Sequence, residues 1–171
     1  MRSRTAIIMV ILAFILQPFL SGLLPAFLTP NLLLCIVLLS AITMAEEDVI
    51  IPVILALIMS LVTDFFCNQF AGVSAVVMIV LVVPLFVVRR HINIENILFI
   101  GVLSLGLNLI YELLYWVIYR SLGSTYGLLY VISKLPMSVL PNAVLLFIGL
   151  FFFSRHVAQE RRDSYFKVKR S

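Results

Sequence analysis

The chain has 171 residues, of which 63% are hydrophobic and 12% charged, with a mean hydropathy of +1.19 and a net charge of +4. A soluble domain carries roughly a quarter charged residues, so this composition excludes an ordinary soluble protein. The charges gather in short clusters between long, continuous apolar runs. Because lipid offers the backbone no hydrogen bonds, such runs must be helices. The sequence therefore predicts an all-α integral membrane protein with a single domain over residues 1–171.

Six apolar runs predict a compact bundle of six transmembrane helices. The first run follows Arg2 and Arg4 like a signal peptide, but hydrophobic residues and prolines continue beyond it, so we expect a retained span kinked at Pro18. Inside that span, the Gln17 amide needs a partner in the bundle. The expected spans are 6–24, 32–45, 49–67, 73–88, 97–119 and 128–153, followed by a basic tail at 155–171.

Positively charged residues predict the orientation of this bundle. With six spans, the amino end, the loops at 46–48 and 89–96 and the tail share one side, which holds ten Lys and Arg residues against only Arg120 on the other side. Both termini are therefore expected to be cytoplasmic. The residues expected to fix topology or attract anionic lipids are Arg89, Arg90, Arg161, Arg162, Lys167, Lys169 and Arg170.

Three of the predicted helices carry polar residues spaced by four within apolar segments. Residues at this spacing share one face of a helix, and polar faces inside a membrane are best satisfied by facing one another. The stripes are Ser60, Asp64 and Asn68 in the third span, Ser104, Asn108 and Glu112 in the fifth, and Lys134, Ser138 and Asn142 in the sixth. We therefore expect an intramembrane polar cluster of Asp64, Asn108, Glu112, Lys134, Ser138 and Asn142.

The charged members of this cluster are expected in the outer half of the membrane, with Lys134 paired to Glu112 and Asp64 above the pair. Two interpretations stay open. The cluster either fixes helix registry and assembly, or forms a ligand or proton site, because intramembrane ionisable residues often mark pathways. A carrier places such residues near the midplane, so their position toward one surface favours registry.

No pattern in the sequence predicts catalysis or metal binding. Cys35 and Cys67 lie in apolar runs without a CxxC partner, and His91 and His156 each lie near an arginine without ligand-like spacing. No nucleophile has a base in the same membrane region, and no glycine-rich phosphate loop is present. We therefore expect a protein that is not an enzyme, without a cofactor, a metal or a nucleic-acid partner.

Residues 30–72 resemble a known family. Pro30–Asn31 opens the second span, and Asp64 in the third is followed eight residues later by Gly72; this pattern resembles the rod shape-determining MreD family, as do the size and the six-span profile. One departure is visible: the glycine-rich surroundings of the family's Asp are replaced here by residues 57–60 and 67–69.

The resemblance implies a non-enzymatic subunit of the bacterial cell-elongation complex in the cytoplasmic membrane. Such a subunit binds the single-span protein MreC and helps connect MreB filaments to the RodA glycosyltransferase and its transpeptidase. Asp64 and Gly72 would be packing elements around the turn after the third helix.

The family is also similar in fold to the substrate-binding S components of energy-coupling-factor vitamin transporters, which is the alternative function. Those components carry small alanines spaced by four on the first helix, whereas Ala6 and Ala13 are seven apart here. The assembly subunit is therefore the preferred expectation.

Overall fold

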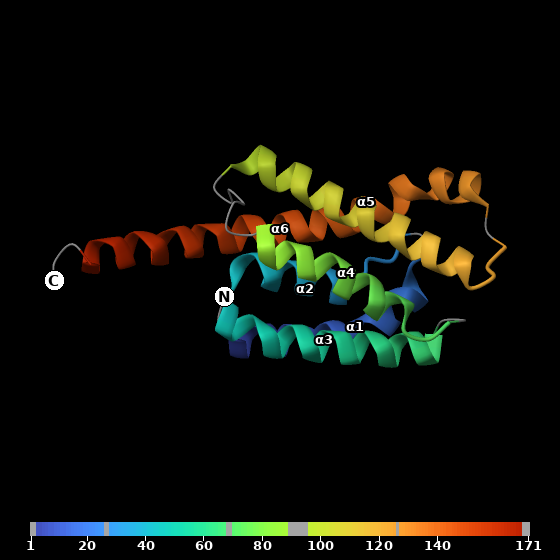
Figure 1. Cartoon of the computed structure of the whole chain (residues 1–171), viewed down its shortest axis with the longest axis horizontal. Helices are drawn as coiled ribbons and strands as arrows, with labels where there is room; N and C mark the ends of the chain where they lie inside the picture. The colour runs from blue at the N-terminus through green and yellow to red at the C-terminus, as the bar shows by residue number, and fades with distance from the viewer. Residues whose placement is uncertain (1–2, 26–27, 68–69, 89–95, 126, 169–171) are drawn as a thin grey trace.

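The protein folds as a bundle of helices in a computed structural model that describes residues 3–25, 28–67, 70–88, 96–125 and 127–168, with side chains up to residue 153 apart from 46 and 67. No strand occurs among these residues. The helices are α1 (Ser3–Leu23), α2 (Leu32–Thr43), α3 (Glu46–Cys67), α4 (Val73–Val88), α5 (Ile97–Ser121) and α6 (Leu128–Val168). The predicted all-α bundle of six helices is confirmed (Figure 1).

Four helices are long and apolar enough to cross a membrane: α1, α3, α5 and residues 128–153 of α6. Their outward faces carry large apolar side chains, such as Phe19, Phe65 and Leu98, that are well exposed in the isolated chain. Apolar side chains on the outside and polar ones inside are the arrangement expected of a helical membrane protein.

The two remaining helices are shorter, close to the short spans expected at 32–45 and 73–88. The 12 residues of α2 measure about 18 Å at 1.5 Å per residue, against roughly 30 Å for the hydrocarbon core. The 16 residues of α4 measure about 24 Å. The α2 helix starts after Asn31, which caps it, and Pro30 lies one residue before the cap.

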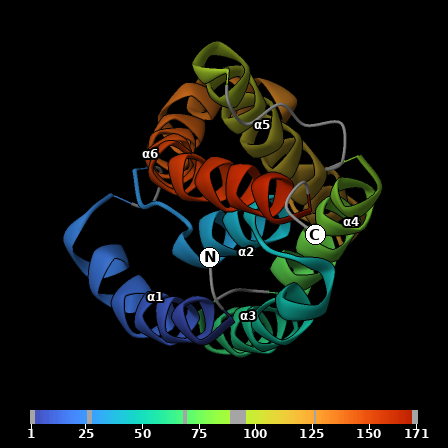
Figure 2. The same ribbon diagram turned by 90° about the vertical axis from the view of Figure 1, so that its left-hand side faces the viewer.

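The short α2 helix occupies the centre of the bundle (Figure 2). It packs against α1, α3, α4 and α6, and 10 of its 12 residues are buried. A helix that is apolar all round, as α2 is, is stable only when neighbours surround it.

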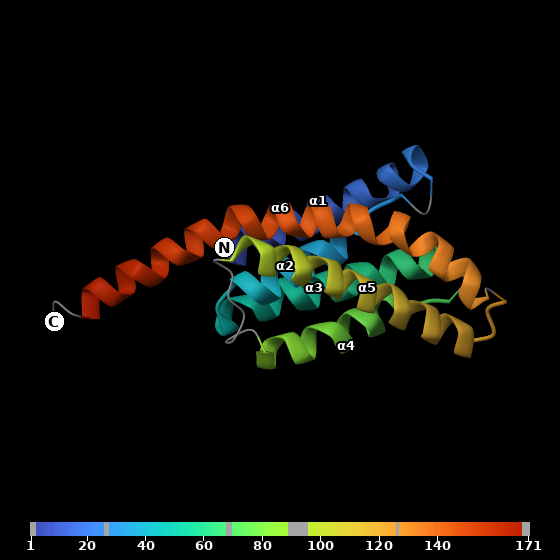
Figure 3. The same cartoon turned by 90° about the horizontal axis from the view of Figure 1, so that it is seen from above.

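The connections of the bundle lie at its two ends (Figure 3). At one end, the turn end, α1 leads into α2, α3 into α4 and α5 into α6; at the other, the tail end, α1 begins and α6 extends beyond the bundle. Both ends of the chain thus leave from the same end of the bundle. That the tail end is cytoplasmic stays a prediction.

Two predicted boundaries change at the tail end. Residues 46–48, expected as a loop, form the first turn of α3, where acidic residues interact favourably with the helix dipole. The expected basic tail is a helical continuation of α6 as far as Val168 and carries Arg161, Arg162 and Lys167. Arg89, Arg90, Lys169 and Arg170 lie outside the described residues.

The turn before α4 generates a first prediction. Gly72 has a φ of +86°, a conformation that costs an L-residue about 1–2 kcal/mol. The site where a Cβ would lie is 3.6 Å from the Leu61 side chain, an ordinary contact, so strain rather than crowding decides the outcome. Gly72→Ala should therefore lower the thermal unfolding midpoint in detergent. Gly106→Ala, in α5 with nothing within 4 Å of the added carbon, should not. An equal midpoint for both variants would contradict this account.

Candidate functional site

The first turn of α2 is held by Asn31, which links three other parts of the chain. Its side-chain oxygen accepts a hydrogen bond from the Leu34 N–H at 3.0 Å, which caps the helix. Its Nδ2 donates to the Tyr111 hydroxyl of α5 at 3.0 Å. Its backbone N–H donates to Oδ1 of Asn142 in α6 at 2.6 Å. One asparagine therefore joins α2 to both α5 and α6.

Gln17 of α1 also makes hydrogen bonds at the start of α2. We call a helix start that is held by hydrogen bonds from other helices a joint. The Nε2 of Gln17 donates to the Pro30 carbonyl at 3.0 Å, and its Oε1 accepts from the Leu32 N–H at 2.9 Å. The amide thus satisfies one backbone acceptor and one backbone donor at the helix start. The expectation that Gln17 needs a partner inside the bundle is confirmed.

The start of α4 is held in a similar way by Asp64 of α3. Its Oδ2 accepts a hydrogen bond from the Ser74 N–H at 2.7 Å and its Oδ1 accepts one from the Ser74 hydroxyl at 2.6 Å. The Asp64 side chain is 1% exposed. A carboxylate at a helix N-terminus is stabilised both by charge-assisted hydrogen bonds and by the helix dipole.

The length of α2 bears on how deep its first turn lies in a membrane. If α2 ends near the tail-end surface, its length of about 18 Å leaves its first turn roughly 10 Å inside a core of about 30 Å. Non-helical backbone at such depth is tolerated only where protein buries it or where it lines a water-filled cavity. At the start of α2, Pro30 is buried, and Thr29 and Asn31 line a cavity.

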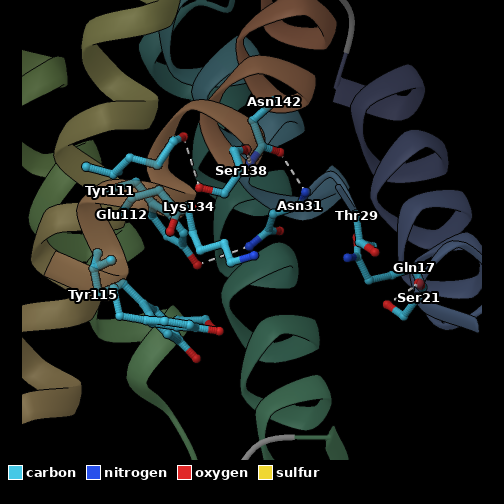
Figure 4. Close-up of a pocket in the computed structure, with 14 residues that line it drawn as sticks. Gln17, Ser21, Thr29, Asn31, Tyr111, Glu112, Tyr115, Lys134, Ser138 and Asn142 are labelled. Carbon is cyan, nitrogen blue, oxygen red and sulfur yellow. Dashed lines mark hydrogen bonds between the residues drawn. The ribbon is translucent and has the colours of Figure 1, made fainter. Parts of the chain in front are cut away.

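A polar cavity of about 560 Å³ opens beside the joint of α2 (Figure 4). Its size falls within the range of small-molecule sites. Its walls come from α1, α4, α5, α6 and the segment before α2: it is lined by Gln17, Ser21, Thr29, Asn31, Ser74, Tyr111, Glu112, Tyr115, Tyr130, Val131, Lys134, Leu135, Ser138 and Asn142. We call it the polar cavity. A neighbouring cavity of about 380 Å³ shares Gln17, Ser21, Asn31 and Ser74 with it and reaches Ser60 and Asp64.

Opposite charges face the polar cavity from α5 and α6. Glu112 and Lys134 both line it, and the Ser138 hydroxyl lies within hydrogen-bonding reach of the Glu112 carboxyl. Stacked rings form an aromatic wall along α5, with centroids 6.0 Å apart for Tyr111 and Tyr115 and 4.9 Å apart for Tyr115 and Tyr119. The cavity therefore offers a cation, an anion, amides, hydroxyls and ring faces to a ligand.

The structure brings together four of the predicted cluster residues, Glu112, Lys134, Ser138 and Asn142, around the polar cavity. Asp64, also predicted in this cluster, caps α4 and lines the neighbouring cavity. Among the described residues, no three His, Cys, Asp or Glu side chains are grouped closely enough to hold a metal ion.

Asn108 takes a different place from the one predicted for it. It is 0% exposed, and its Nδ2 donates to the Ser104 carbonyl of the same helix at 2.8 Å. Its Oδ1 accepts no hydrogen bond from the described part of the chain. The polar residues of α5 therefore lie in two different environments. Glu112 lines the polar cavity, whereas Asn108 is buried by packing between helices.

Sequence reasoning missed two residues of the joints, Ser74 and Tyr111. Ser74 could have been found from the sequence, because a serine at the start of an apolar run, two residues after a glycine, is a helix-start signal. Tyr111 was hidden among the aromatic residues at the end of the fifth span, whose abundance near a membrane surface is expected without any specific contact.

The chain matches no protein-family model, no curated protein and no solved structure.

The joint of α4 generates a second prediction. Asp64→Leu should lower the free energy of unfolding by about 2–3 kcal/mol, because both the N–H and the hydroxyl of Ser74 lose their acceptor in a buried place. Asp64→Asn, which keeps one oxygen acceptor, should cost less. Thermal unfolding in detergent measures both, with Thr63→Val as the matched control, since the Thr63 hydroxyl donates only within its own helix. Asp64→Leu as mild as Thr63→Val would refute the capping role.

The charges of the polar cavity generate a third. Lys134→Met should destabilise the protein more than Lys134→Met combined with Glu112→Gln, because the single change leaves a carboxylate facing the cavity without the opposite charge. The expected difference is about 1 kcal/mol. Unfolding of the wild type, both single variants and the double variant measures this coupling. Equal damage from the single and double variants would rule out the pair.

Proposed function

We propose that this chain is a non-enzymatic membrane subunit of the bacterial cell-elongation complex, of the MreD kind. In this role it binds an MreC-like single-span protein and helps couple MreB filaments to peptidoglycan synthesis by RodA and its transpeptidase. The observation that carries the proposal is that the residues of the family-like pattern meet at the two joints of the bundle. Pro30 and Asn31 start α2, while Asp64 and the positive-φ Gly72 start α4.

A spaced pattern of four residues is weak evidence for a family when it is seen only in the sequence. The placement of these residues in the folded chain adds support. In the folded chain, each of the four has a distinct physical task at the start of one of the two short central helices. Asn31 makes hydrogen bonds to α5 and α6, and Asp64 ties α3 to α4. A scaffold that positions a partner requires such fixed relations between its helices.

The outer surface also suits an assembly role. The exposed faces of α3 and α4 carry branched apolar residues, among them Ile54, Ile58, Val80 and Val83, which offer a second membrane helix a surface for packing. In this proposal the bundle sits in the bacterial cytoplasmic membrane with both termini in the cytoplasm, so that α6 extends toward the filaments.

The second candidate is a substrate-binding S component of a vitamin transporter, and the polar cavity is the observation that favours it. The first helix argues against it. Ala6 and Ala13 are 0% and 3% exposed, packed inside the bundle, so they offer no small-residue face on which an energising module could dock. The assembly role therefore stands first.

Affinity capture of the tagged protein from mild-detergent membranes of its own host distinguishes the two, with mass spectrometry of both proteins and small molecules. We expect an MreC-like protein and wall-synthesis proteins to be captured with the wild type. Asp64→Leu and Gly72→Leu should abolish this capture. Gly106→Leu should preserve it, because nothing lies within 4 Å of a carbon added at that glycine.

Size-exclusion chromatography of each variant separates loss of binding from loss of the fold. Capture of ATPase subunits together with a bound vitamin would overturn the assembly role in favour of the second candidate.

A further inference from the structure

An apolar groove continues the polar cavity along the side of the bundle. It has a volume of about 350 Å³ and lies between α1 and α6, with α2 as its floor. Its walls include Leu12 and Leu16 from α1 and Leu145 and Ile148 from α6. On the floor lie Cys35, Ile36 and Leu39, and we call this feature the apolar groove.

The residues that line the cavity and those that line the groove follow one another along α1 and α6. On α1, Gln17 lines the cavity and the adjacent Leu16 lines the groove. On α6, Ser138 and Asn142 line the cavity, and Leu145 follows in the groove less than one turn later. The Gly149 position touches Leu39, which shows that α2 and α6 run alongside each other over this length.

The groove has the dimensions of a site for a hydrocarbon chain. Leu32 to Leu39 on its floor span about 10 Å of helix, and Leu145 to Phe153 span about 12 Å. A ligand that fills both spaces has a polar head at the turn end and an apolar chain directed toward the tail end. In a membrane, a phospholipid of the leaflet at the turn end has this form and this direction.

The charges of the cavity select among phospholipids. Lys134 offers an ammonium that binds a phosphate, and Glu112 offers a carboxyl group that accepts hydrogen bonds from an amine. The amides of Gln17 and Asn142 and the hydroxyls of the cavity wall complete a surface for a head that carries both signs of charge. A head with a phosphate alone leaves Glu112 facing a like charge, which is unfavourable.

We infer that the polar cavity and the apolar groove together form a binding site for a zwitterionic aminophospholipid of the phosphatidylethanolamine type. Its phosphate lies toward Lys134, its amine toward Glu112, and one acyl chain lies between α1 and α6 on α2. This site goes beyond the proposed assembly role and does not depend on it.

The test uses the full chain in nanodiscs that contain equal amounts of phosphatidylethanolamine and phosphatidylglycerol. After gentle release, native mass spectrometry counts the lipids that stay bound to the protein. We expect the wild type to retain a single phosphatidylethanolamine in preference to phosphatidylglycerol. Equal retention of the two lipids would overturn the inference, because bulk lipid shows no such selection.

Variants separate the head site from the chain site. Lys134→Met should reduce retention of phosphatidylethanolamine by about tenfold, the effect of losing roughly 1.4 kcal/mol of affinity. Leu145→Trp, at a groove residue that is 38% exposed, should fill the groove and reduce retention likewise. Val144→Trp is the matched control, because Val144 is 52% exposed on the same helix and does not line the groove.

Two further outcomes would overturn the inference. Lipid retention unaffected by Leu145→Trp would show that the acyl chain lies outside the groove. Free phosphoethanolamine that binds as tightly as the whole lipid would show that the acyl chain contributes nothing to binding. Loss of a partner protein by Leu145→Trp, with lipid retention unchanged, would assign the groove to a partner helix instead. Because lipid retention and partner capture are separate readouts, failure of this site leaves the test of the assembly role intact.

Discussion

The hydrogen bonds around the first turn of α2 are the constraint on which the rest of the structure depends. A helix that starts inside the membrane exposes backbone N–H groups at a depth where water is scarce, and each unpaired group costs several kcal/mol there. Here Gln17, Asn31 and Asn142 supply the partners, and they come from three different helices. The positions of α1 and α6 around α2 are fixed by this need, and the Asn31 side chain adds a hydrogen bond to Tyr111 of α5.

The same physical solution occurs a second time at α4. Asp64 supplies the acceptors for its first turn, and Gly72 provides the backbone conformation that turns the chain back into the bundle. Polar side chains line the space beside the starts of these two short helices.

The polar residues around the polar cavity can have a structural role and a ligand-binding role at the same time. The amides and the Asp64 carboxylate act on the backbone of the joints, whereas the side chains of Glu112 and Lys134 face the cavity from within α5 and α6. Charged side chains are costly inside a membrane unless they contact each other, other protein groups or a ligand. A scaffold that holds a structural lipid satisfies these charges and keeps its helices in register at the same time.

By itself, the sequence determined the helical class, the six helices and the inward position of Asp64 and Asn142, because hydropathy and a spacing of four residues are local properties of a chain. It also indicated that Gln17 needs a partner. The tertiary structure alone decided which residues are the hydrogen-bond partners of these side chains. Asn142 accepts a hydrogen bond from the backbone of Asn31, which is 111 residues away, and Asp64 accepts two hydrogen bonds from Ser74, ten residues away. Hydrogen bonds depend on distances of a few tenths of an ångström between groups on different helices, and the periodicity of a single helix carries no information about those distances.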